Sequence, residues 1–166
     1  MGEGERKNTS NVPDCIRLEH WNYARQVCRS NGDIAEEKID VCCVQVTRCT
    51  GSGARVMGKG MSRYKFFWQG CKDGNSGVGF LISDRWIDRI VDAMRVNERI
   101  MCLKVLIGDK LITHICAYAP QTGRSAEEKD SFWDQITCVN GRIPVSGVDC
   151  CWRGSEWSRW YKCRWV

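Results

Sequence analysis

Two apolar segments separated by only three residues constrain the fold of this chain more than any other feature. Ile100–Ile107 and Leu111–Tyr118 are rich in β-branched residues, and Gly108-Asp109-Lys110 lies between them. Strand-like segments joined by a short glycine-containing turn are typical of a β-hairpin. The chain is therefore expected to contain an antiparallel pair of strands within a β-rich domain.

More strand-like segments precede this hairpin. The run IDVCCVQ at residues 39–45 is nearly continuously apolar and predicts a buried strand. The glycines at positions 51, 53, 58 and 60 predict a loop, and Gly70–Gly77 predicts a turn between two strands. The complete set of strands expected before the hairpin is Ile16–Tyr23, residues 39–45, Tyr64–Gln69 and Val78–Ser83.

The clearest helix begins at Ser125. Its hydroxyl suits an N-cap, and Glu128 three residues later completes a capping box in which the carboxylate reaches back to the cap. The apolar face of this helix is expected to contain Phe132, Trp133 and Ile136.

Two segments are less regular. Asp33–Lys38 predicts a short helix, and Asp84–Val96 fits a helical period while allowing a strand towards its end. Strands with helices on either side of them indicate the α/β or α+β class, with sheets packed into a sandwich.

Composition narrows the classes of protein. The chain has 166 residues, of which 43% are hydrophobic, so one domain can bury a core. No apolar run is long enough to span a bilayer, and Met1–Asn11 has no signal-peptide character. We therefore expect an intracellular protein, nuclear or cytoplasmic and not secreted, with no membrane partner.

Neither the net charge nor the cysteine content predicts a phosphate-binding or zinc-binding site. The net charge is +5, but residues 152–166 contribute +3 of it, which leaves a balance too small to predict phosphate binding. The twelve cysteines include no C-x-x-C pair, which argues against a zinc site. Cys42, Cys102 and Cys116 lie in apolar strand segments and are expected to be core residues, and His114 is expected to be structural.

Several short segments occur together in an order and spacing that resemble one family. They are residues 39–45, GSGAR at 51–55, Tyr64–Gly70, GVG at 77–79, ERIM at 98–101, YAP at 118–120 and the helix at 127–135. This set resembles the endonuclease/exonuclease/phosphatase (DNase I-like) superfamily, above all the endonuclease domain of LINE-type retrotransposons and the craniofacial development proteins similar to it. The likeness covers roughly residues 16–147.

The resemblance implies a fold and a chemistry. The fold would be a partial DNase I-like sandwich of two β-sheets flanked by helices, incomplete at the C-terminus. The reaction would be hydrolysis of a DNA phosphodiester, in which Mg²⁺ polarises the phosphate and stabilises the leaving oxygen. DNA is the implied partner, and no small-molecule cofactor is expected.

The implied active site is incomplete in this sequence. The family's strand ends V-Q-E-T with a metal-binding Glu, whereas this chain has Val46 in V-Q-V-T; the alternative is that Val46 is an ordinary strand residue. The resemblance assigns Tyr118 to the Y-A-P tyrosine that contacts the phosphate, and Asn22 to the early asparagine. The later G-D-x-N and Asp-His motifs have no counterpart, so cutting activity is expected to be impaired. A non-catalytic module that binds nucleic acid or protein is the alternative.

The sequence divides into three parts by composition. Residues 1–14 are expected to form a flexible arm, 15–147 the truncated endonuclease-like domain, and 148–166 an irregular tail rich in Trp, Cys and Arg. A one-base frameshift near Ser146 or Gly147 would produce such a tail from a G-G-D-L-N-G-H-V-G motif, because each Trp codon supplies GG to the next frame. A truncated sandwich would also expose one apolar sheet face, through which the chain is expected to self-associate.

Overall fold

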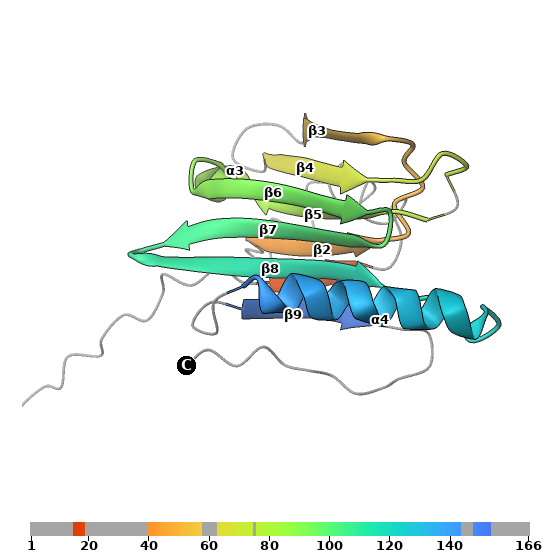
Figure 1. Ribbon diagram of the computed structural model, residues 1–166. Coiled ribbons are helices and arrows are strands. Elements are labelled where there is room, and N and C mark those ends of the chain that lie inside the picture. Colours follow the sequence, from red (N-terminus) through yellow and green to blue (C-terminus); the bar gives the residue numbers. More distant parts are fainter. Residues whose placement is uncertain (1–14, 19–39, 58–62, 75, 144–147, 154–166) are drawn as a thin grey trace, which may run out of the picture.

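The computed structural model describes residues 15–18, 40–57, 63–74, 76–143 and 148–153, with side chains described from residue 40 to 143. Two β-sheets lie face to face in this part of the chain, and a long helix covers one of them (Figure 1). The elements in chain order are β1 Cys15–Leu18, β2 Val41–Gln45, β3 Ser52–Met57, β4 Tyr64–Gln69, β5 Val78–Ser83, α3 Asp84–Ile87, β6 Ile90–Asn97, β7 Ile100–Ile107, β8 Lys110–Tyr118, α4 Ala126–Gly141 and β9 Val148–Arg153.

The first sheet has the strand order β1-β2-β5-β4-β3. β1 runs parallel to β2, and the other neighbours are antiparallel. All five residues of β2 are buried, which explains why its sequence is apolar from Val41 to Val44 rather than alternating. The strands predicted at residues 39–45, Tyr64–Gln69 and Val78–Ser83 are confirmed, and β1 confirms the beginning of the strand expected from residue 16.

The second sheet has the strand order β6-β7-β8-β9. The predicted hairpin is confirmed: β7 and β8 pair from Ile100↔Ala117 to Ile107↔Lys110, so that Gly108 and Asp109 form the connection. Gly108 has a φ of 62°, a conformation that favours glycine and explains its place in this turn. β9 runs parallel to β8, and Tyr118 pairs with Arg153.

The two sheets bury a shared core. Alternate residues of β2, β5, β7 and β8 point into it, and its largest fully buried side chains include Phe80, Ile82, Met101 and Leu103. Cys42, Cys102 and Cys116 are fully buried and His114 is buried in β8, as predicted. Gln45 Nε2 donates to the carbonyl of Ala117 across the sandwich, which fixes the end of β2 against the end of β8.

α4 covers the outer face of the second sheet (Figure 1). Phe132 and Val139 are buried there against Ile100, Cys102 and Ile115. Trp133 was expected on the same face but is 43% exposed, because it follows Phe132 by one position and so points about 100° away around the helix. Its ring meets the edge of the Phe132 ring instead.

Two predictions from the first half of the chain are corrected by the structure. The glycine-rich segment predicted as a loop contains the strand β3, whose side chains are mostly exposed because it lies at the edge of its sheet. Asp84–Val96 is a single helical turn, α3, followed by the edge strand β6, so the helical alternative holds for four residues only.

One prediction about the C-terminal region is also corrected. The irregular tail predicted from residue 148 begins with the strand β9, whose backbone pairs with β8. The uncovered sheet face and the self-association through it stay predictions: among the described side chains most apolar residues of the two sheets lie in three buried clusters, whereas Val56, Val91, Val96, Leu106 and Leu111 are exposed. The arm at 1–14, the helix at Asp33–Lys38 and residues 154–166 lie outside the described residues. Within the described part, no helix is long and apolar enough to cross a membrane.

Candidate functional site

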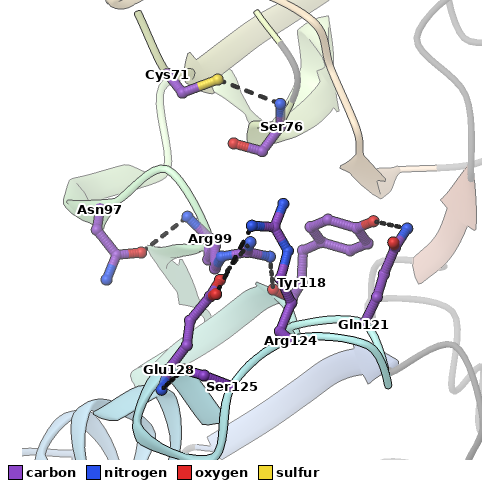
Figure 2. A network of polar contacts seen from close by, with 9 residues as sticks. All are labelled: Cys71, Ser76, Asn97, Arg99, Tyr118, Gln121, Arg124, Ser125 and Glu128. Carbon is purple, nitrogen blue, oxygen red and sulfur yellow. Dashed lines mark hydrogen bonds and ion pairs between the residues drawn. The ribbon is translucent and has the colours of Figure 1, made fainter. Parts of the chain in front are cut away.

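A polar pocket of about 420 Å³ lies where β8 ends. Three segments surround it: the connection from β4 to β5, the turn from β6 to β7, and the loop from β8 to α4. Its lining residues are Cys71, Asp73, Ser76, Glu98, Arg99, Tyr118, Gln121, Arg124 and Glu128. Figure 2 shows how the polar side chains of these segments approach one another.

Arg99 is the best-anchored cation of the pocket. Its backbone N–H donates to Asn97 Oδ1 at 2.8 Å, and its carbonyl accepts from the N–H of Tyr118 at 2.8 Å. The guanidinium lies 5.5 Å from the centre of the Tyr118 ring and donates to the Tyr118 carbonyl at 3.4 Å. These contacts fix both Arg99 and the end of β8, where the sequence places Tyr118.

Glu128 joins α4 to this cluster. Ser125 Oγ accepts from the N–H of Glu128 at 3.3 Å, which confirms the predicted N-cap. The Glu128 carboxylate does not complete the capping box, because it pairs with Arg99 at 3.1 Å and Arg124 at 3.8 Å. Charged donors bind a carboxylate more strongly than a neutral amide does, and this accounts for the difference.

Further polar groups line the remaining sides of the pocket (Figure 2). Gln121 Nε2 donates to the hydroxyl of Tyr118 at 3.4 Å, and the N–H of Ser76 donates to Cys71 Sγ at 3.2 Å. Tyr118 therefore keeps its hydroxyl at the pocket, where a phosphate oxygen could accept a hydrogen bond from it.

Val46 directly follows β2 and is not part of that strand. Its φ is 51°, in the left-handed region that a β-branched residue rarely adopts. The next residue, Thr47, is fully buried and its N–H donates to the Gly77 carbonyl at 3.0 Å, which holds the backbone in this conformation. The interpretation of Val46 as an ordinary strand residue is therefore wrong.

Position 46 is also linked to the end of β8. Cys116 Sγ lies 3.5 Å from the Val44 carbonyl, and the next residues along, Gln45 and Ala117, are joined by a hydrogen bond. Val46 and Tyr118 each follow one of these paired residues. The structure thus brings together the ends of the two strands on which the resemblance places site residues.

The described residues do not fit a magnesium site. The isopropyl group of Val46 has no lone pair to donate, and Glu128 is engaged by two arginines. Among the residues with described side chains, no three of His, Cys, Asp or Glu gather in a way that could hold a metal ion. The thiol of the nearby Cys49 does not replace the missing carboxylate, because Mg²⁺ prefers oxygen ligands.

The site contains residues that sequence reasoning did not single out. Tyr118 lies at the pocket, whereas Asn22 lies outside the described residues. Arg99, Gln121 and Arg124 were missed, although each lies within six residues of Tyr118 or in the E-R-I-M segment. A polar residue in a turn or loop does not belong to a repeating pattern of apolar positions. Its role can therefore be recognised only from its contacts in the folded structure.

The chain matches no protein-family model, and no curated protein is similar enough in sequence to serve as a relative. Its fold is similar to the endonuclease domain of TRAS1, a telomere-specific non-LTR retrotransposon, with a TM-score of 0.52 and 14% identity over 80% of this chain and 55% of that domain. Truncated Caenorhabditis elegans TDP2 (TM-score 0.47, 10% identity, 77% and 53% covered) is more distant. The Xenopus laevis APE2 catalytic domain (TM-score 0.46, 12% identity, 75% and 51% covered) is similarly distant.

These similarities concern the fold. The predicted partial DNase I-like sandwich is confirmed, with two sheets and flanking helices in the α+β class. The chain spans about half the length of each of these solved structures.

Proposed function

We propose that this chain is an endonuclease-like domain of retrotransposon origin that holds DNA but is impaired in cutting it. The single observation that carries the proposal is Val46, which replaces a carboxylate ligand at the end of β2 with an apolar group. Mg²⁺ is usually held by one or two protein carboxylates, so the loss of one removes much of the binding site. The fold similarity to a retrotransposon endonuclease domain supports the stated origin.

Magnesium would supply the polarisation of the scissile phosphate, and without it the chain's own residues have little to offer for hydrolysis. Tyr118 can donate a hydrogen bond, and Arg99 can neutralise charge near the phosphate. Neither group activates a water molecule, and no described histidine lies at the pocket. These residues can position a phosphodiester without breaking it.

The residues that line the pocket are better suited to binding DNA than to cutting it. Arg99, Arg124 and Tyr118 present donors of the kind that contact DNA phosphates. Because three carboxylates on the same lining, Asp73, Glu98 and Glu128, more than offset the charge of the two arginines, we expect weak binding through few phosphates. A second candidate, a protein-binding module on the same scaffold, has no comparable cluster to support it among the described residues.

The proposal is tested by measuring DNA binding as a function of salt. Fluorescence anisotropy with a labelled duplex is expected to give a logarithmic salt slope of about −1 to −2, as for one or two phosphate contacts. Tyr118→Phe, which removes one hydroxyl, should weaken binding by about two- to tenfold. Absence of binding at low salt, or binding that does not respond to salt, would contradict the proposal.

A further inference from the structure

Two arginines in the pocket converge on a single carboxylate. Arg99 Nη2 lies 3.1 Å from one oxygen of Glu128, and Arg124 Nη1 lies 3.8 Å from the other (Figure 2). The three side chains together carry one net positive charge, and two further carboxylates on the pocket lining, Asp73 and Glu98, bring the lining as a whole to one net negative charge. Guanidinium groups bind carboxylate and phosphate with the same geometry. A phosphate could therefore bind the two arginines where the Glu128 carboxylate does now.

Arg99 does not depend on Glu128 for its position. Its guanidinium also donates to the Tyr118 carbonyl and lies over the Tyr118 ring, and its side chain is only 16% exposed. A pre-positioned, partly shielded cation binds an anion with a small loss of side-chain entropy. Removal of the Glu128 charge would therefore leave the cation in place at the wall of the pocket.

Arg124 is the more exposed of the two arginines, and its side chain has more freedom to move. Its side chain is 58% exposed and comes from the loop before α4, so it can reach towards the pocket or towards solvent. The pocket beside the two arginines has room for a phosphate group, and the Tyr118 hydroxyl lies on the same lining.

We infer that Arg99 and Arg124 form a phosphate subsite beside Tyr118, in which the Glu128 carboxylate is the internal occupant. The phosphate can come from a DNA backbone or from free phosphate, and only the first source rests on the proposed function. The rival interpretation is a structural ion pair that ties the turn from β6 to β7 to α4. It predicts that a neutral residue at 128 lowers stability and creates no binding.

The test compares Glu128→Gln with Glu127→Gln. Both variants remove one negative charge from the first turn of α4, but Glu127 contributes nothing to the lining of the pocket. Inorganic phosphate, with chloride at equal ionic strength as reference, should raise the Tm of Glu128→Gln and leave that of Glu127→Gln unchanged. The affinity of Glu128→Gln for a labelled DNA duplex should rise about tenfold at low salt, with a salt slope steeper by about one.

A third variant checks the geometry. Adding Arg99→Lys to Glu128→Gln keeps the charge but removes the planar fork, so most of the gain in phosphate binding should disappear. If Glu128→Gln does not fold, the wild-type chain serves instead: the NMR signal of Arg99 Nε–H should shift as phosphate is added, and less so in Arg124→Gln.

The outcomes separate this inference from the proposed function. Phosphate binding by Glu128→Gln without DNA binding would support the subsite and overturn the proposed role in holding DNA. DNA binding that is equal in Glu128→Gln and Glu127→Gln, with no response to phosphate, would overturn the subsite and leave the proposed function standing. In the wild-type NMR experiment, absence of any shift of Arg99 would also overturn the subsite.

Discussion

At the scale of single residues, Val46 is the position on which the proposed loss of cutting depends. The sequence identified Val46 through its neighbours in V-Q-V-T, but the left-handed backbone is visible only in the structure. A backbone conformation of this kind leaves no sequence signal when the residue is not glycine or asparagine. For the same reason the role of Arg99 was not predictable, since it depends on contacts with residues up to 29 positions away.

The strain at Val46 leads to a stability prediction. Val46→Asn should raise the free energy of unfolding by about 1 kcal/mol, because asparagine tolerates a positive φ and strain at such a residue amounts to about 1–3 kcal/mol, partly offset by lost burial. Val56→Asn is the matched control, since Val56 lies in the extended strand β3 and is 51% exposed. It should destabilise slightly. Chemical denaturation of both variants checks the signs, and a loss of stability in Val46→Asn would contradict the account.

At the scale of elements, the sequence predicted those strands that are buried and regular. β2, β4, β5, β7 and β8 all carry continuous or aromatic apolar runs. β3 was missed because an exposed edge strand needs no apolar pattern and because glycines normally indicate loops. β9 was missed because its identity as a strand comes from backbone pairing with β8 and not from any alternation in its residues.

The N-terminus of α4 gives a prediction about pH. A hydrogen bond from its own backbone N–H, with a second from the Ser125 hydroxyl, lowers the pKa of the exposed Glu127 carboxyl below the ordinary value of 4.5. A carboxyl with a lowered pKa in the folded state stabilises the fold above the unfolded-state pKa, and this contribution is lost as pH falls through the folded-state pKa.

Glu127→Gln removes this contribution. The difference in Tm between wild type and Glu127→Gln should be constant above about pH 6 and should shrink as pH falls below about 4.5. Differential scanning calorimetry across this range measures the difference. If the difference in Tm between wild type and Glu127→Gln grew as the pH fell, the Glu127 carboxylate would not stabilise the folded state as proposed.

At the scale of the whole molecule, a partial sandwich of two sheets was predictable in outline from the strand-like segments and their family-like order, but the three buried clusters were not. The detailed pairing was not, because register depends on contacts between distant segments. Tyr118 pairs with Arg153 in the parallel β8–β9 ladder, so β9 ends beside the end of β8. The frameshift hypothesis places the first glycine of the G-G-D-L-N-G-H-V-G motif at Trp152, near this end of β9.

The coding sequence from Pro144 to Val166 tests that hypothesis. The frame shifted by one base should encode G-G-D-L-N-G-H-V-G, with the Trp152 codon supplying the first glycine. Sequencing of transcript and genome gives the answer. A shifted frame without these residues would mean that the strongly basic, tryptophan-rich segment arose in another way.

We propose that this sandwich can still hold a phosphate at the end of β8 but has lost metal-dependent cutting. The most direct test is a nicking assay on supercoiled plasmid, with Mg²⁺ or with EDTA, using wild type and Tyr118→Phe. We predict that wild type with Mg²⁺ nicks no more than it does with EDTA, and that Tyr118→Phe behaves in the same way. Nicking by wild type that requires Mg²⁺ and disappears in Tyr118→Phe would show an active nuclease and contradict the account.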